Sequence, residues 1–203
     1  MGLEAGATTM TPVLLQDSYS AVAAVSPYLF YFTVYSFLGW VLEGSYNLYS
    51  AGTFRKEGFL KGPFKPMYGC APLLLLTGQS IGLPLPIFLM LALIVPSAVE
   101  FVSGWLLKGI FRKQWWDYSG MPYQLQGHIC LKFSLYWWGL SIACIYGLQP
   151  LVHFLYLHVE RVWTPVIPLA LLLFSADLLW TFRTRRRGLR ELDSTEQLEL
   201  GEG

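Results

Sequence analysis

Long apolar stretches separated by short polar connections dominate the pattern of the chain. Because about 20 helical residues cross a hydrocarbon core of about 30 Å, each long stretch predicts a transmembrane helix. Five spans are predicted, the second of them short and broken by Pro72 and Gly78, at residues 28–49, 67–82, 84–110, 125–148 and 163–182. The apolar stretch 151–157 is too short to cross and is predicted to be an interfacial or extracytoplasmic helix.

Composition agrees with this membrane interpretation. Of the 203 residues, 54% are hydrophobic and 13% are charged, whereas about a quarter of the residues of a soluble domain are charged. The fold class predicted is an all-α, polytopic helical membrane bundle. Its expected organisation is an extracytoplasmic N-terminal tail over residues 1–25, the bundle over 26–183 and a disordered cytoplasmic tail over 184–203.

Basic residues indicate how the bundle is oriented. They gather in the connection after the first span, in the connection after the third and behind the fifth, whereas the other connections carry almost none. With five spans these three regions share one side, which the positive-inside rule makes cytoplasmic. The N terminus is therefore predicted outside and the C terminus inside, in a multi-pass protein of the plasma membrane. The first residues lack the basic region of a cleavable signal peptide.

Four charged residues lie in the interior of the predicted spans rather than at their ends, and all four fall in the cytoplasmic half: Glu43, Glu100, Lys132 and Asp177. A charge at bilayer depth costs about 2.5–3.5 kcal/mol, so such residues usually face the bundle interior. One lysine cannot neutralise three carboxylates. At least one of the three carboxylates is therefore protonated, hydrated, paired with His128 or Arg112, or bound to a cationic ligand. We expect Glu43, Glu100 and Lys132 to converge, either as a functional site or as a structural polar network.

Asp117 is unusual because it stands among aromatic residues, Trp115, Trp116 and Tyr118. Aromatic residues at the end of a span form an interfacial belt, which needs no acid. Asp117 either caps the following turn or closes the polar cluster from below. The residues predicted to bind a substrate or ion are therefore Glu43, Glu100, Lys132, Asp117 and His128, with Asp177 and Arg112 as further candidates, and no catalytic residue is assigned.

Missing motifs narrow the chemistry. The sequence has no G-x-x-x-x-G-K-[ST] segment, so a separate subunit would have to hydrolyse ATP. It also lacks H-E-x-x-H and C-x-x-C. The three cysteines fall in or beside spans and are interpreted as small buried hydrophobes. No cofactor and no metal site are predicted.

Several ordered motifs resemble the type IV ABC-transporter (CmpB-like) integral membrane family. The similarity covers most of residues 31–139, and one departure is Lys56-Glu57-Gly58, where Asn-Arg-Gly is expected in relatives. The resemblance implies a permease role. The motifs are Tyr35-Ser36-Phe37-Leu38-Gly39-Trp40-Val41-Leu42-Glu43, Gly58-Phe59-Leu60, Gly62-Pro63, Tyr68-Gly69, Glu100-Phe101, Trp116-Asp117-Tyr118-Ser119, Gly127-His128-Ile129-Cys130-Leu131-Lys132-Phe133-Ser134 and Trp138-Gly139.

The preferred functional hypothesis is a permease-like transport component with a polar site in the cytoplasmic half of the bundle. The first alternative is a membrane enzyme for a lipid or lipid-linked substrate, which leaves open whether the chain is an enzyme. In that case Glu43 or Glu100 serves as acid or base, and Lys132 and Arg112 bind an anionic head group. The second is a non-catalytic accessory subunit. Candidate partners are the lipid bilayer, a separate ATPase subunit and a second copy of the chain, but not nucleic acid.

Overall fold

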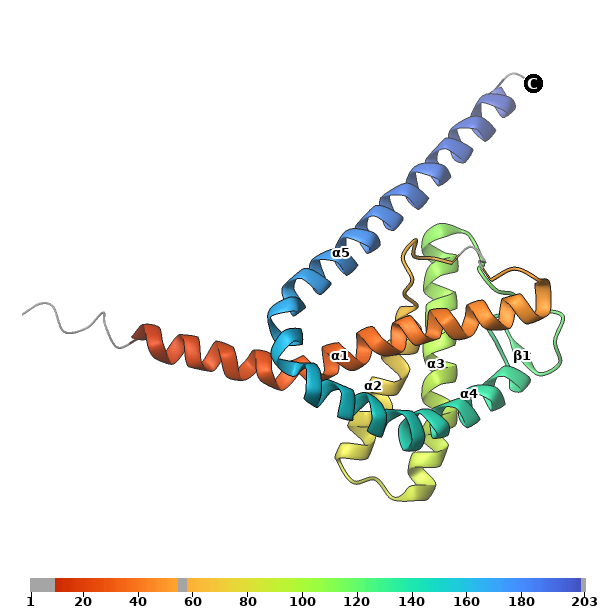
Figure 1. Ribbon diagram of the computed structural model, residues 1–203. Coiled ribbons are helices and arrows are strands. Elements are labelled where there is room, and N and C mark those ends of the chain that lie inside the picture. Colours follow the sequence, from red (N-terminus) through yellow and green to blue (C-terminus); the bar gives the residue numbers. More distant parts are fainter. Residues whose placement is uncertain (1–9, 55–57, 202–203) are drawn as a thin grey trace, which may run out of the picture.

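The computed structural model describes residues 10–54 and 58–201, and within them the side chains of residues 22–54 and 58–189. This part of the chain is mostly helical (Figure 1). One small antiparallel hairpin pairs Gln124 with Cys130 and Leu125 with Ile129. The elements are α1 (Met10–Ala51), α2 (Pro66–Ser80), α3 (Leu85–Phe111), β1 (Gln124–Leu125), β2 (Ile129–Cys130), α4 (Leu131–Ala143), the π-helical segment η1 (Cys144–Leu148) and α5 (Gln149–Gly201).

The helices cross rather than all running parallel. Helix α1 packs against α2 and α5, and α3 packs against α2 and α4. In Figure 1, α3 runs across the direction shared by α1 and α4. Three segments of the described chain are long and apolar enough to cross a membrane: Val22–Ala51, Leu85–Phe111 and Leu131–Leu189. The fold is therefore that of an all-helical membrane protein, while the count of five spans and the orientation of the termini stay predictions.

The region after α4 differs from the sequence prediction. Residues 151–157 are not a separate short helix but part of α5, which follows η1 without a break. Glycine and proline are absent from residues 151–164, so nothing in the sequence interrupts the helix there. Farther along, α5 bends sharply (Figure 1), and the two prolines inside it, Pro165 and Pro168, supply the cause of a kink.

Pro150 explains why the helix widens at η1. A proline inside an α-helix lacks the N–H and clashes with the carbonyl four residues earlier, which here belongs to Tyr146. The wider π-helical turn over Cys144–Leu148 makes room for the ring, and the Gln149 N–H bonds to the Cys144 carbonyl five residues back.

Both terminal helices extend past the predicted domain borders. Helix α1 already begins at Met10, and α5 continues to Gly201. Neither the border at 25/26 nor that at 183/184 coincides with a helix end. The division into a bundle and two tails stays a prediction.

An aromatic seam joins α1 to the first part of α5. Phe30, Tyr31 and Tyr35 of α1 are buried against Val152 and Tyr156 of α5. The Tyr31 hydroxyl bonds to His153 Nδ1 at 2.6 Å, and the Tyr35 hydroxyl donates to Gln149. Phenol rings thus bury apolar area while each hydroxyl keeps a polar partner.

Two glycines let α1 and α2 approach closely. A Cβ added at Gly69 would lie 2.5 Å from Ser36 Oγ and 2.8 Å from the Phe32 carbonyl oxygen. A Cβ at Gly39 would lie 2.2 Å from the Tyr68 ring. Small residues at membrane helix crossings allow this backbone proximity, and here it places Tyr68 against α1.

Candidate functional site

Glu43 forms an ion pair with Lys65, the residue just before α2. Lys65 Nζ lies 2.9 Å from Glu43 Oε1, and the two side chains are 19% and 31% exposed. The Lys65 backbone N–H also donates to the Ser36 carbonyl at 2.9 Å, which ties the start of α2 to α1. The charge of Glu43 is therefore compensated by Lys65, a residue that the sequence had assigned only to a basic connection.

Glu100 is buried and held by neutral donors. Its side chain is only 2% exposed. The Tyr118 hydroxyl donates to Oε1 at 3.0 Å, and Trp137 Nε1 donates to Oε2 at 2.8 Å. Tyr118 comes from the loop between α3 and α4, where its ring stacks on Phe133. Both carboxylate oxygens thus have a partner, which a buried acid requires.

Lys132 lies apart from this arrangement. Helix α4 begins at Leu131, so Lys132 is in its first turn and its side chain is exposed. Its ammonium lies 5.9 Å from the centre of the Tyr136 ring. The structure therefore does not place Lys132 in the Glu43 ion pair or among the hydrogen-bond donors to Glu100.

Asp117 stabilises its own loop, as in the first of the two sequence-based alternatives. Its Oδ1 accepts the Ser119 N–H at 2.9 Å, as in an Asx turn. These bonds to Ser119 lower the pKa of Asp117. A Cβ at Gly127, where φ is +70°, would lie 2.6 Å from that same Oδ1. Glycine at this position therefore allows both the left-handed backbone and the close approach.

His128 is buried beside the same loop. Its ring is 2% exposed and stands edge-on to Phe101. Its carbonyl accepts Trp116 Nε1 at 2.9 Å. Burial and the nearby Lys108 lower the pKa of His128, so its imidazole is neutral at pH 7. We assign the His128 contacts to holding the loop on α3.

Asp177 and Arg112 have local roles in the structure. Asp177 Oδ2 accepts the Gly62 N–H at 3.0 Å, and Arg185 donates to the Gly58 carbonyl at 3.1 Å. These bonds of Asp177 and Arg185 hold the connection before α2 against α5. Arg112 ends α3 with a left-handed φ of 49°. Ligand binding by any of the residues chosen from the sequence stays a prediction.

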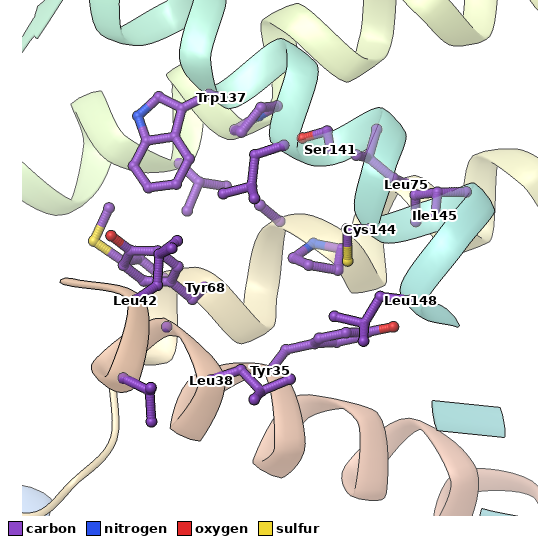
Figure 2. A pocket seen from close by; sticks show the side chains of 18 of the residues that line it. Tyr35, Leu38, Leu42, Tyr68, Leu75, Trp137, Ser141, Cys144, Ile145 and Leu148 are labelled. Atoms are coloured by element: carbon purple, nitrogen blue, oxygen red, sulfur yellow. The ribbon is translucent and has the colours of Figure 1, made fainter. Parts of the chain in front are cut away.

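An apolar cavity of about 380 Å³ lies between α1 and the α4–η1 segment. The upper and lower walls in Figure 2 come from these two segments, with α2 behind them. Tyr35 and Leu148 lie at one end, and Tyr68 and Trp137 lie at the other (Figure 2). The remaining walls are mainly aliphatic, and they include Leu38, Leu42, Ala71, Leu75, Pro96, Leu140 and Ile145.

Trp137 separates the cavity from Glu100, and Tyr68 packs beside it. Their rings meet edge to face, with centroids 5.1 Å apart. Trp137 lines the cavity while its N–H holds Glu100. The Tyr68 ring also packs on α1 at Gly39, one helical turn before Glu43. We call this pair of rings the aromatic partition.

Helical spacing shows how close the carboxylates come to the cavity. Gly39 and Pro96 line it, and Glu43 and Glu100 each follow four residues later. Residues four apart share a helix face, so each carboxylate stands one turn beyond a wall residue. The sequence indicated these acids, but their partners Lys65, Tyr118 and Trp137 were missed. A sequence cue existed for Tyr118 and Lys65, since both belong to the motif-bearing connections.

Comparison with known proteins identifies one family. A search of curated proteins and a search of solved structures found no match. A family model with the description "Putative ABC-transporter type IV" matches residues 30–182. The matched region covers α2 to α4, the α1–α5 seam, the aromatic partition and both carboxylates. Because the match covers most of the chain, the protein belongs to this ABC-transporter type IV family of membrane proteins.

Proposed function

We propose that the protein is a permease-like component of a plasma-membrane transporter and that its substrate occupies the apolar cavity. The aromatic partition carries this proposal. The apolar hollow lies on one side of Trp137, and the buried acid Glu100 accepts the Trp137 N–H on the other. The family description supports the same assignment.

The partition favours transport over catalysis. A general acid must come within hydrogen-bond reach of the reacting atom. Trp137 stands between the cavity and Glu100 and occupies one of the two carboxylate oxygens. A substrate in the cavity reaches Glu100 only if Trp137 moves. Such a gated passage suits a permease, in which polar groups at membrane depth mark the substrate path.

Energy for transport would come from a separate ATPase subunit, because the sequence carries no phosphate-binding loop. The partner would associate with the connections that the positive-inside rule places in the cytoplasm. A second copy of the chain remains a further candidate partner.

Deleting the gene and comparing cells with medium by mass spectrometry tests the transport role. We expect at least one compound to change its cell-to-medium ratio severalfold, without becoming a different compound. The wild-type gene should restore the ratio. Tyr68→Phe should not, because it removes the hydroxyl of the aromatic partition at the end of the cavity where Trp137 holds Glu100.

The matched control is Tyr136→Phe, which removes a hydroxyl from an exposed tyrosine of α4 outside the cavity. This variant should restore the ratio fully. Accumulation of an unprocessed lipid precursor, with unchanged distribution of all compounds, would instead establish the enzyme alternative. Equal restoration by both variants would remove the aromatic partition from the mechanism.

We further propose five spans, with the N terminus outside and the C terminus in the cytoplasm. Single cysteines at Ser18 and Ser194, in a chain whose natural cysteines are replaced, should react with a membrane-impermeant thiol reagent from opposite sides of the membrane. The Ser18→Cys variant should be labelled in intact cells, and the Ser194→Cys variant only after permeabilisation. Labelling of both from one side would contradict this topology.

A further inference from the structure

We infer that the cavity holds a single hydrocarbon chain of an amphiphile, with the polar head of that molecule at the Tyr68 end. This inference names the substrate class of the proposed transport site and rests on the proposed function only for the claim that the bound molecule is moved. Size, lateral opening and the polarity of one end each support it.

The dimensions fit one chain. The wall residues of α1 run from Tyr35 to Ser45 and those of α4 and η1 from Trp137 to Leu148. At about 1.5 Å per residue each wall is about 15 Å long, which is half of a hydrocarbon core of about 30 Å and thus the depth of one leaflet. A methylene group occupies about the volume of a water molecule, roughly 30 Å³. The cavity of about 380 Å³ therefore takes about a dozen methylene groups.

The side of the cavity is open to a chain arriving from the bilayer. Leu42 of α1 and Leu140 of α4 both line the cavity, and they are 43% and 38% exposed. Helices α1 and α4 pack against other helices, α2 with α5 and α3 respectively. The cavity lies between them, so its lateral rim consists of aliphatic side chains that would face lipid.

An apolar wall alone cannot select its occupant, because lipid tails are as apolar as leucine side chains. Selection must come from a polar group, and the charged residues lie beside one end. There Tyr68 packs on α1 at Gly39, one helical turn before Glu43, whose ion pair with Lys65 is partly exposed. At the opposite end the Tyr35 hydroxyl is already used by Gln149. The head of the amphiphile therefore lies near Tyr68.

Photocrosslinking tests this inference on the purified full-length protein in lipid nanodiscs. One probe is a phosphatidylcholine with a diazirine on one acyl chain, and the second is a free twelve-carbon fatty acid with a diazirine. We expect crosslinks on cavity residues such as Leu38, Leu42 and Leu140, and we expect an excess of the same unreactive amphiphile to suppress them. The probe that gives more crosslinked protein shows whether the cavity takes its occupant from the membrane lipids or binds a free single-chain amphiphile.

Two variants of α4 form a matched pair for this experiment. Ser141→Phe adds a ring inside the cavity, whereas Gly139→Phe adds the same ring where an added Cβ meets no neighbouring atom. Crosslinking should fall roughly tenfold in the first variant, equivalent to about 1.4 kcal/mol of lost affinity, and stay unchanged in the second. If Ser141→Phe does not fold, Ala71→Leu fills the same cavity from α2.

Crosslinks that spread over outward-facing residues such as Leu135 and Leu169, and that no competitor suppresses, would overturn the inference, because they would report only the surrounding lipid. Loss of the transport effect with retained, saturable crosslinking would refute the proposed function and leave the binding site intact. Transport without any saturable crosslinking would refute the substrate class alone.

Discussion

Glu100→Leu is expected to lower the melting temperature of the protein in detergent by roughly 8–16 °C. Leucine removes both acceptors, so the Trp137 N–H and the Tyr118 hydroxyl lose their partner in a site that is 2% exposed. Each buried donor without a partner costs about 1–3 kcal/mol. A total of about 4 kcal/mol corresponds to this shift, since 1 kcal/mol moves the melting temperature of a chain of this size by about 2–4 °C.

Glu100→Gln provides the comparison that separates structure from function. The amide oxygen can still accept from Trp137, and the amide nitrogen can donate to the Tyr118 oxygen once that hydroxyl turns. We therefore expect a loss of about 1 kcal/mol, a few degrees of melting temperature. If transport needs the charge or the proton of Glu100, this stable variant should be inactive. A Glu100→Leu variant as stable as the wild type would contradict the hydrogen-bonding role of the carboxylate.

Gly69→Ala is expected to destabilise the protein by about 3 kcal/mol, because the added methyl group meets the α1 backbone. The nearest atoms are Ser36 Oγ at 2.5 Å, Phe32 Cδ2 at 2.6 Å and the Phe32 carbonyl oxygen at 2.8 Å, and a backbone atom cannot turn away as a side chain can. Overpacking of this kind typically costs about 1–3 kcal/mol. Thermal unfolding followed by tryptophan fluorescence should show a melting temperature about 6–12 °C lower.

Gly139→Ala is the matched control for this substitution. Gly139 also lies inside a helix, but a Cβ there meets no atom within 4 Å. Alanine should therefore be neutral or raise stability by about 0.5–1 kcal/mol through reduced backbone entropy of the unfolded chain. Equal effects of the two substitutions would show that α1 and α2 do not approach as closely as described.

The sequence predicted the helical, apolar character of the chain and directed attention to Glu43 and Glu100, because charges within apolar segments need a reason. Their partners were harder to predict. The sequence pattern favours a partner of opposite charge, whereas Glu100 is satisfied by the neutral donors of Tyr118 and Trp137. Which neutral groups meet an acid depends on how α3, α4 and their loop pack, and hydropathy carries no information about that.

Helix boundaries account for the placement of Lys132. A span predicted to begin at residue 125 puts Lys132 two turns deep, but residues 124–130 form a hairpin and α4 begins at Leu131. The run of apolar residues could not reveal the turn, because the chain enters the helix without a proline or a capping side chain. Conversely, Asp117 beside Ser119 carried a local signal for its role, since both lie within one turn.

Because of the π-helical segment, the number of residues between α4 and α5 matters as much to the fold as which residues they are. Removing one residue from η1 would return it to an ordinary α-helix, and every residue of α5 would then rotate by about 100° about the helix axis. Gln149 and His153 would turn away from Tyr35 and Tyr31, and the aromatic seam would open. Relatives of this chain can thus exchange side chains along the seam, but a single-residue deletion between Trp137 and Gln149 would require compensation on α1.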